Sequence, residues 1–335
     1  MTPESMARAR RLVTPALAAA VDSLSPELRH IVRYHWGWVD EQGKPAQGAA
    51  GKALRPTLAM LSAEAVGAPA ERACAGAAAV ELVHDFTLLH DDVMDGDRER
   101  RHRPTAWTVF GVGPAICAGD SLMLLAQRVL LEDPAETRVA ALDALCDAAH
   151  EVIAGQLLDL SFEGRLDVGL GAYLRMAARK TGALLACSAS IGAVLAGGEP
   201  ESVGALRRFG VALGLAFQAV DDWLGIWGRP ERTGKPLASD LRQRKSSLPI
   251  VFGLGAEGDE ACELRALVAS PGPLAEDALA RGVELLAACG AEAHTRAEAR
   301  RQIAIARSAL ARAPIEDGAR QELLELASFV VEREF

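Results

Sequence analysis

Residues 84–95 read HDFTLLHDDVMD, so Asp91, Asp92 and Asp95 end an otherwise apolar helical pattern. Asp91 and Asp95 are four residues apart, and a helix therefore carries them one above the other on one face. Like charges placed in this way repel and destabilise a helix by roughly 0.2–0.5 kcal/mol. A divalent cation offsets the repulsion, and ligands that are all carboxylate oxygens suit Mg²⁺ or Mn²⁺ better than zinc. A solvated acidic helix end is the alternative that this motif alone leaves open.

A second acidic pair ends another apolar pattern, in residues 217–225, which read FQAVDDWLG. Gln218 precedes Asp221 by three residues, so its amide lies on the same helical face as that carboxylate. The two acidic clusters are about 130 residues apart, and bundle cores build metal sites from facing helices of this kind. The second cluster therefore favours a metal site over two unrelated acidic helix ends.

Basic residues follow each acidic cluster. They are Arg98, Arg100, Arg101 and Arg103 after the first, Lys235, Arg242, Arg244 and Lys245 after the second, and Lys52 and Arg55 near the start. Each run alone is more often a solvated face or loop. Carboxylates that hold Mg²⁺ beside Arg and Lys can form a diphosphate site, because metals bridge phosphate oxygens and guanidinium groups bind the others bidentately. The order of the clusters along one chain favours such a site.

Helical periodicity dominates the chain, and no run of alternating Val, Ile or Thr indicates a sheet. The pattern predicts helices over residues 54–66, 73–92, 120–131, 138–158, 174–196, 203–226, 278–287 and 296–310. Breaks at Gly and Pro separate them, and no repeat or low-complexity linker occurs. We therefore expect an all-α fold, a single-domain antiparallel bundle over residues 1–335 around a central cavity.

Charge and composition exclude several classes of protein. The 45 Asp and Glu residues exceed the 36 Lys and Arg, and the net charge of −9 argues against nucleic acid or an anionic membrane as the main partner. The six cysteines are scattered without a CxxC pair, so we expect buried free thiols in a reducing cytoplasm. The N-terminus lacks an apolar signal segment. The longest uncharged run, residues 181–198, is interpreted as a core helix and not a transmembrane segment.

Taken in order along residues 51–249, these motifs resemble the trans-isoprenyl (polyprenyl) diphosphate synthases of the short-chain type, which make farnesyl or geranylgeranyl diphosphate. Residues 84–95 with the Arg100-Arg101 pair resemble the first aspartate-rich motif of that family, and residues 217–222 resemble the second. The segments that match shorter family elements are Gly119-Asp120, Lys180-Thr181, Gly234-Lys235-Pro236, Asp240-Leu241 and residues 245–249. The resemblance implies a prenyltransferase that condenses an allylic diphosphate (dimethylallyl, geranyl or farnesyl) with isopentenyl diphosphate.

The resemblance also assigns roles by position. It implies that Mg²⁺ is held mainly by Asp91, Asp95 and Asp221, with Asp92 and Asp222 in support. It places Arg100, Lys180, Lys235 and Lys245 at the allylic diphosphate, and Lys52, Arg55, His84 and Arg101 at the isopentenyl diphosphate. Thr181 and Gln218 would face the developing allylic cation, with Phe217 also in contact with substrate. The implied partners are roughly three Mg²⁺ ions, replaceable by Mn²⁺, and a second copy of the chain in a homodimer.

Two positions depart from the family pattern. The second motif usually ends in a further Asp, where this chain has Gly225, and Ala53 replaces a common basic residue. Two alternatives therefore stay open. A class I terpene cyclase shares the bundle and the first motif, although it would leave Lys52, Arg55 and Arg101 without a use. A weakly active regulatory subunit of a prenyl synthase is the other alternative, favoured by Gly225 and opposed by the intact first motif.

Product length is predicted from the residues just before Asp91. Residues one to two turns earlier lie roughly 6–12 Å along the helix axis, a depth that suits the floor of a channel for a short chain. A helical wheel places Thr87 nearer the Asp91 face than Phe86. The resemblance nevertheless favours Phe86 as the floor, because an aromatic residue at this position is similar to short-chain synthases. An ordinary core phenylalanine is the alternative.

Overall fold

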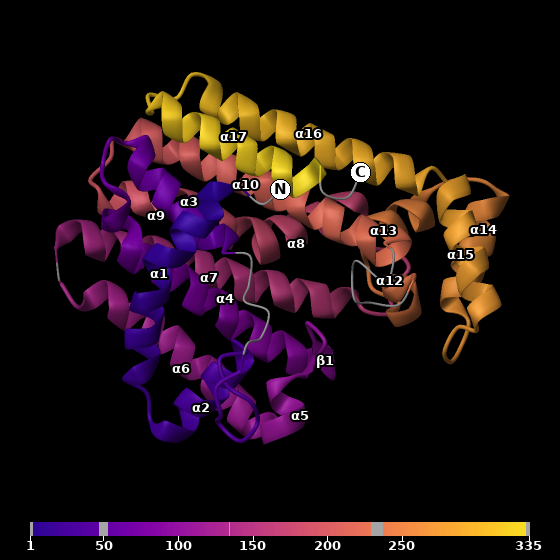
Figure 1. The fold of residues 1–335 in the computed structure, drawn as a ribbon. Coiled ribbons are helices and arrows are strands. Elements are labelled where there is room, and N and C mark those ends of the chain that lie inside the picture. The colour runs from indigo at the N-terminus through magenta and orange to yellow at the C-terminus, as the bar shows by residue number, and fades with distance from the viewer. Residues whose placement is uncertain (1–2, 47–52, 134, 229–236, 333–335) are drawn as a thin grey trace. The chain divides into compact units, whose positions relative to one another are not determined.

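The computed structural model describes residues 3–46, 53–133, 135–228 and 237–332, and nearly all of its regular structure is helical (Figure 1). The all-α prediction is confirmed. The helices are α1 (Glu4–Asp22), α2 (Pro26–His35), α3 (Leu54–Ala65), α4 (Cys74–Met94), α5 (Ala106–Phe110), α6 (Val112–Leu131), α7 (Glu136–Phe162), α8 (Leu170–Ala177), α9 (Ala183–Leu195), α10 (Pro200–Trp227), α12 (Ser239–Gln243), α13 (Leu248–Gly255), α14 (Asp259–Ala269), α15 (Glu276–Ala288), α16 (Ala291–Ala311) and α17 (Asp317–Glu332). A 3₁₀ turn covers Ala70–Ala73, and a π-helical turn covers Ala178–Gly182.

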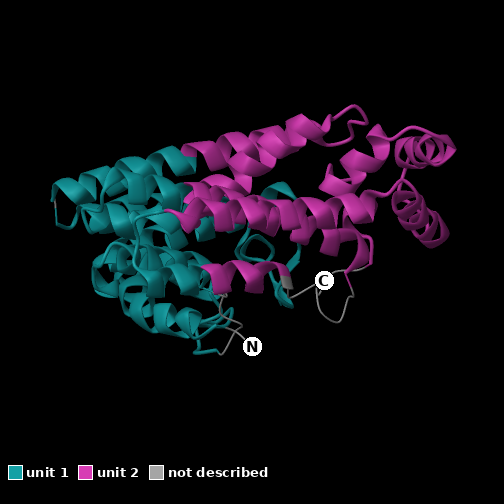
Figure 2. Ribbon diagram, turned by 90° about the horizontal axis from the view of Figure 1, so that it is seen from above, with its two compact units in different colours: residues 1–149, 187–207, 313–323 teal, residues 150–186, 208–312, 324–335 magenta. Residues whose placement is uncertain are grey.

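The chain divides into two compact units, which Figure 2 shows in different colours. Unit 1 contains residues 1–149, 187–207 and 313–323, and unit 2 contains residues 150–186, 208–312 and 324–335. The helices α7, α9, α10 and α17 contribute residues to both units. The first aspartate cluster belongs to unit 1 and the second to unit 2, and each is described within its own unit.

In unit 1, helix α4 packs against α1, α3 and α6. Its apolar face is built from small residues, and glycines let neighbouring helices come close. Gly76 of α4 is one of these, because a side-chain Cβ there would lie 2.8 Å from Leu195 Cδ1 of α9. Close packing of this kind fixes the position of α4, and therefore of the aspartates at its C-terminal end.

A short hairpin follows α4 and was not predicted. Strand β1 (Glu99–Arg100) pairs antiparallel with β2 (Arg103–Pro104). The two turn residues, Arg101 and His102, have φ of 54° and 60°, the positive values that tight two-residue hairpin turns require. Neither residue is a glycine or an asparagine, so no sequence signal for this turn existed.

In unit 2, helices α12 to α15 surround an apolar cluster. Its fully buried members include Leu241, Leu264 and Leu286. The sequence pattern did not predict α12, α13 or α14, which are short and lie in a segment of mixed composition. It predicted one helix over residues 174–196, which the structure divides at the π-helical turn.

Two further expectations concern the cysteines and the long apolar segments. Among the cysteines, Cys117, Cys146 and Cys262 are exposed and only Cys187 is buried, so the expectation of six buried thiols was wrong. The uncharged run over residues 181–198 lies largely in α9. Helices α6 and α10 are long and apolar enough to cross a membrane, with 44% and 56% of the apolar window buried inside the structure. Burial of this kind is also found in core helices, so the two helices are weak evidence for a membrane protein.

Candidate active site

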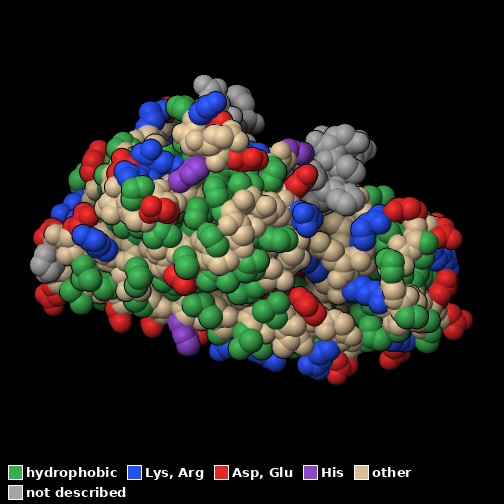
Figure 3. Space-filling view, turned by 90° about the horizontal axis from the view of Figure 1, so that it is seen from below, with side chains coloured by type: hydrophobic (Ala, Val, Ile, Leu, Met, Phe, Trp, Pro, Cys, Tyr) green, Lys and Arg blue, Asp and Glu red, His purple; other side chains and the backbone are tan. Residues whose placement is uncertain are grey.

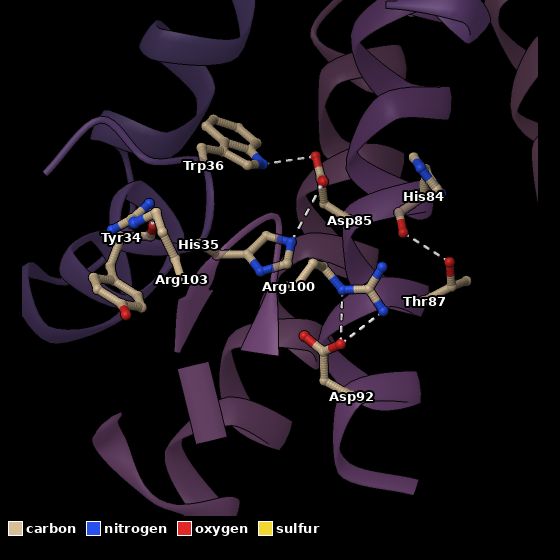
Figure 4. Close-up of polar contacts among 9 residues, drawn as sticks. All are labelled: Tyr34, His35, Trp36, His84, Asp85, Thr87, Asp92, Arg100 and Arg103. Atoms are coloured by element: carbon tan, nitrogen blue, oxygen red, sulfur yellow. Dashed lines mark hydrogen bonds and ion pairs between the residues drawn. The ribbon is translucent and has the colours of Figure 1, made fainter. Parts of the chain in front are cut away.

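The first aspartate cluster occupies the last turn of α4. Asp91 and Asp95 are partly exposed, and the Asp95 N–H donates to the Asp91 carbonyl at 2.8 Å, so the cluster closes the helix. Asp92 is buried, with 1% of its surface exposed. Arg100 of β1 donates to Asp92 Oδ1 from Nε at 2.7 Å, and its Nη2 lies 2.7 Å from the same oxygen (Figure 4).

The second oxygen of Asp92 is the feature of this cluster that fits a metal. Asp92 Oδ2 is buried and has no hydrogen-bond partner among the residues that the structure describes. A buried polar atom left without a partner costs about 1–3 kcal/mol, and a cation would remove that cost. Burial raises the pKa of the Asp92 carboxyl, while the charge of Arg100 acts in the opposite direction. No group of three or more His, Cys, Asp or Glu side chains in the described part of the chain could hold a metal by itself. Any metal here would need oxygens from a further source, such as a diphosphate.

The end of α2 and the residues just after it hold the hairpin and α4 together. Trp36 Nε1 donates to Asp85 Oδ2 at 2.7 Å, and His35 lies 3.6 Å from the other oxygen of Asp85 (Figure 4). Arg103 donates to the carbonyls of Tyr34 at 3.0 Å and Val39 at 3.1 Å. Arg103 therefore has a structural use, and the hairpin is held where Arg100 reaches Asp92.

A cavity of about 80 Å³ lies beside the start of α3. It is lined by Arg10, Trp36, Trp38, Glu81, Asp85 and Arg101, among others. Burial, followed by repulsion from Asp85, raises the pKa of Glu81 to about 7, and Arg55, Arg101 and Arg10 oppose this shift. Glu81 and Arg10 were not singled out from the sequence, because neither belongs to a motif. Only the packing of α1 against α4 brings these two side chains to the cavity.

The predicted isopentenyl diphosphate residues are in part brought together here. The charges of Arg55 and Arg101 act on His84, whose pKa is held well below its usual value mainly by burial. A neutral imidazole beside two guanidinium groups can donate one hydrogen bond without adding to their mutual repulsion. Lys52 lies outside the described residues, so its predicted role has no structural description.

Phe86 and Thr87 lie one turn before Asp91. Phe86 is buried, and its ring meets that of His90 edge to face at 4.8 Å. His90 Nε2 lies 3.1 Å from the Ile116 carbonyl of α6. A side-chain Cβ at Gly119 would lie 2.3 Å from that nitrogen, so a glycine is required there while His90 keeps this position. Thr87 Oγ1 donates to its own helix, at the His84 carbonyl.

In unit 2, Lys180 and Thr181 lie in the π-helical turn between α8 and α9. Such turns are rare and are frequently found at functional sites. Lys180 Nζ lies 2.5 Å from Asp159 Oδ2 of α7. Gly155 of α7 lets the turn approach, since a side-chain Cβ there would be 2.3 Å from the Lys180 nitrogen. Asp159 is therefore a site residue that the sequence reasoning missed.

The second aspartate cluster ends α10. Asp221 is exposed, whereas Asp222 is 4% exposed and accepts three hydrogen bonds. Gln218 Nε2 donates to Asp222 Oδ1 at 2.7 Å, the Leu248 N–H donates to Oδ2 at 2.6 Å, and Tyr173 donates to the same Oδ2. Burial, followed by the charge of Asp240, raises the pKa of Asp222 to about 7. Because three protein donors already bind both oxygens of Asp222, this carboxylate holds α8, α10 and the start of α13 together. Metal binding by Asp222 stays a prediction.

The same network fixes the polar pair that was predicted to face the allylic cation. Thr181 Oγ1 donates to Gln218 Oε1 at 2.6 Å, and the amide of Gln218 is held by Asp222. Phe217 is half-buried beside Gln218 on α10. Lys245 is half-buried and lines a cavity of about 220 Å³ with Arg165 and Arg244. Lys235 lies outside the described residues.

The chain is similar to known proteins over nearly its whole length. The polyprenyl synthetase family model matches residues 38–286. A (2E,6E)-farnesyl diphosphate synthase of Mycobacterium tuberculosis is 46% identical over 329 residues, which cover 97% of this chain and 92% of that protein. A geranylgeranyl diphosphate synthase of the same organism is 44% identical over 285 residues, covering 84% and 81%. The crystal structure of a polyprenyl synthetase from Streptomyces coelicolor A3(2) has a TM-score of 0.95 at 47% identity, covering 99% of this chain and 100% of that one.

Proposed function

Because the chain belongs to the polyprenyl synthetase family and is a short-chain isoprenyl diphosphate synthase, we propose that it elongates an allylic diphosphate with isopentenyl diphosphate to farnesyl or geranylgeranyl diphosphate. The observation that carries the proposal is the pair of acidic helix ends, Asp91–Asp95 and Asp221, each followed by basic side chains. Both sets are intact except at Gly225.

The reaction begins with loss of diphosphate from the allylic substrate. The family uses a divalent metal to bind diphosphate, and we propose roughly three Mg²⁺ ions as cofactors, with Asp91, Asp92 and Asp95 as the ligands from unit 1 and Asp221 as the ligand from unit 2. When bound, the metal neutralises charge on the leaving diphosphate. Arg100, Lys180 and Lys245 contribute fixed positive charge where negative charge develops, which favours the transition state over the ground state.

Breaking the allylic C–O bond leaves a carbocation, and we propose that Thr181 and Gln218 stabilise it. Thr181 donates a hydrogen bond of 2.6 Å to Gln218, and Gln218 donates one to Asp222. These two bonds fix the orientation of the hydroxyl and amide dipoles before the reaction. The double bond of isopentenyl diphosphate then attacks the cation, and a proton is lost to complete the new double bond. Among the side chains that the structure describes, none must accept this proton, and the departed diphosphate can accept it.

For the product length, we propose the buried Phe86 and the half-buried His90 as the floor of the chain. Gly119 lets His90 reach α6, and Phe86 packs on the His90 ring, so the two rings support each other. The relatives of similar identity include both a farnesyl and a geranylgeranyl diphosphate synthase, which is consistent with a short product of either length.

For the assembly, we propose a homodimer that buries an apolar stripe on α6. Val112, Ile116, Leu124 and Leu131 are 45%, 38%, 67% and 47% exposed, which is unusual for large apolar side chains gathered on one helix. Figure 3 shows one face of the molecule, on which hydrophobic side chains cover broad areas. Light scattering should give twice the chain mass, and Leu124→Glu should shift the mass toward the monomer.

The experiment that tests the activity is direct. The pure protein is incubated with Mg²⁺, labelled isopentenyl diphosphate and each of dimethylallyl, geranyl and farnesyl diphosphate, and the products are separated by chain length. We expect elongation, and Asp91→Asn should reduce turnover by several orders of magnitude because it removes a metal ligand. Asp143→Asn, an exposed change on α7, is the control. Cyclic hydrocarbons without incorporation of isopentenyl diphosphate would instead identify a terpene cyclase.

A further inference from the structure

A cavity of about 220 Å³ lies within unit 2, and none of its lining residues belongs to either aspartate cluster. Its walls are the residues after α7, the segment between α12 and α13, α13 itself and the end of α14. Helices α13 and α14 pack against each other (Figure 1). An engineered protein cavity of roughly 150 Å³ holds a benzene molecule, so this one has room for a small organic ligand. Of its lining residues, the proposed reaction uses only Lys245.

One part of the lining is apolar. It consists of Leu166, which is half-buried, and of Ile250, Leu254 and Val268, which are buried. Ile250 and Leu254 are four residues apart on α13 and therefore share a face of that helix, while Val268 comes from the last turn of α14. Small-molecule sites typically combine apolar walls with a few polar groups that fix the orientation of the ligand. These walls suit a short hydrocarbon chain.

The other part of the lining is basic, and Arg244 is its best-defined member. Arg244 follows α12 with φ of 55°, a left-handed conformation that is unfavourable for a residue with a side chain. Its guanidinium donates to the Gly272 carbonyl at 2.7 Å, and no carboxylate of the described residues forms an ion pair with it. A half-buried cation that faces only a neutral acceptor, at the rim of a cavity, favours an anionic ligand.

Arg165 lines the same cavity and is available to an anion. It donates to both oxygens of Asp167, at 2.9 and 3.0 Å, in a pair whose side chains are 50% and 75% exposed. Exposed pairs contribute little to stability, so a phosphate group can replace Asp167 at this guanidinium. Guanidinium groups bind phosphate oxygens through two parallel hydrogen bonds, and Arg165 and Arg244 therefore suit a phosphate or diphosphate headgroup.

Hydrogen bonds fix the basic wall of the cavity. Ser246 Oγ donates to the Phe162 carbonyl at the end of α7, at 3.1 Å. The Arg244 N–H donates to the Leu241 carbonyl at 3.2 Å, which holds the residue after α12 in its turn. The site is therefore formed before a ligand arrives, and binding does not have to order it.

We propose that this cavity is a second, non-catalytic site for a short prenyl diphosphate, with the headgroup at Arg165 and Arg244 and the tail against α13 and α14. The volume holds about one or two isoprene units, so dimethylallyl and geranyl diphosphate fit and farnesyl diphosphate does not. The bound headgroup lies beside Lys245, which the proposed reaction uses at the allylic diphosphate. Excess short substrate therefore inhibits the enzyme by drawing Lys245 away. This coupling rests on the proposed function, whereas the binding site does not.

The test measures binding by calorimetry with geranyl S-thiolodiphosphate, whose carbon–sulfur bond resists ionisation. EDTA removes the metal that the catalytic site requires, so the cavity is observed by itself. Arg244→Gln removes the positive charge, and Ala269→Trp fills the cavity from an exposed position at the end of α14. Arg300→Gln on α16 and Ala266→Trp on α14, both exposed and outside the lining, are the matched controls.

We expect one site per chain in EDTA and two with Mg²⁺. In EDTA, Arg244→Gln should weaken binding at least tenfold, Ala269→Trp should abolish it, and the two controls should bind as the parent does. In steady-state assays, excess dimethylallyl diphosphate should inhibit the parent. Ala269→Trp should relieve this inhibition without changing the rate at low substrate. Circular dichroism checks that each variant is folded, and Arg244→Gln still decides the question if Ala269→Trp does not fold.

Several results would overturn the inference. A parent that binds nothing in EDTA, or parent-like binding by folded Arg244→Gln, would exclude the site. Equal affinity for inorganic pyrophosphate would show that the walls bind no tail, and equal affinity for octanoate would exclude a diphosphate site. Equal affinity for farnesyl S-thiolodiphosphate would contradict the limit on tail length.

The two levels of the proposal fail separately. Inhibition that Ala269→Trp does not relieve would overturn the coupling to Lys245. Binding in EDTA that depends on Arg244, in a parent without prenyltransferase activity, would support the site and refute the proposed function. Elongation activity without binding in EDTA would leave the proposed function intact and exclude the second site.

Discussion

The hydroxyl of Tyr173 on α8 donates a hydrogen bond to the buried carboxylate of Asp222 on α10. Asp222 in turn holds the amide of Gln218, whose oxygen accepts from Thr181. Tyr173 is 2% exposed, and burial raises the pKa of its hydroxyl well above the usual value, so it stays protonated and donates. Tyr173 is thus a positioning residue that acts on the predicted cation-stabilising pair through Asp222.

Tyr173→Phe should lower kcat by about tenfold while the KM values for both diphosphates change little. The loss of one donor frees Asp222 and Gln218 to move, and the fixed dipoles that stabilise the cation become less well aligned. The unfolding free energy should fall by about 1–3 kcal/mol, the cost of a buried group left without a partner. Steady-state kinetics and urea denaturation measure the two effects.

Ser202→Ala is the control for Tyr173→Phe, because it removes another buried hydroxyl, one that donates to the Pro314 carbonyl in unit 1. It should reduce stability without reducing kcat. If Tyr173→Phe loses stability but retains the parent kcat, the hydrogen bond is structural only.

Arg101→Ala should raise KM for isopentenyl diphosphate by at least tenfold, with a smaller change for the allylic substrate. Arg101 lies on the turn of the hairpin, lines the cavity beside α3 and is exposed enough to reach a ligand. Truncation removes a charge-assisted hydrogen bond to phosphate. Initial rates with each substrate varied in turn provide the measurement. Equal losses for both substrates would contradict the proposed division of the cations.

Phe86→Ala should lengthen the product, because it opens space beneath a chain that grows beside α4. Phe86 is 8% exposed and packs on His90, so the substitution leaves room where the ring was. Chromatography of the dephosphorylated products measures the shift. Leu88→Ala truncates a half-buried side chain on another face of the same helix and should leave product length unchanged. An active Phe86→Ala variant with the parent product distribution would exclude Phe86 as the floor.

Glu81→Gln should remove part of the pH dependence of stability. Burial and Asp85 raise the pKa of Glu81 to about 7, above its usual 4.5. Between these pH values the folded state retains a proton that the unfolded state releases, so stability falls as pH rises from about 4.5 to 7. The difference between variant and parent in unfolding free energy should change by up to about 3 kcal/mol between pH 4.5 and 7.5.

Urea denaturation at the two pH values measures this effect of Glu81→Gln. Glu71→Gln, at an exposed position in the turn before α4, should leave the pH dependence as it is in the parent. Identical pH profiles for Glu81→Gln and the parent would show that Glu81 is ionised in the folded state throughout this range.

The sequence by itself determined the helical class, most of the long helices and the location of both acidic helix ends. These features depend on periodicity and on residues within one or two turns of each other, which fix which side chains share a face. The spacing of Asp91 with Asp95 needed no tertiary information, whereas Gln218 was paired with Asp221 from its spacing and donates to Asp222 in the structure. The order of the motifs was sufficient to identify the family that the comparisons then showed.

Only the tertiary structure decided which partners those residues have. Asp159 meets Lys180, Tyr173 meets Asp222, and Asp240 fills the space beside Gly225, although each pair comes from different helices. No short-range pattern specifies these meetings, because they depend on how closely helices approach and on which glycines permit it. The absence of an aspartate at position 225 therefore looked like a loss in the sequence, whereas packing brings a carboxylate from α12 to the same place.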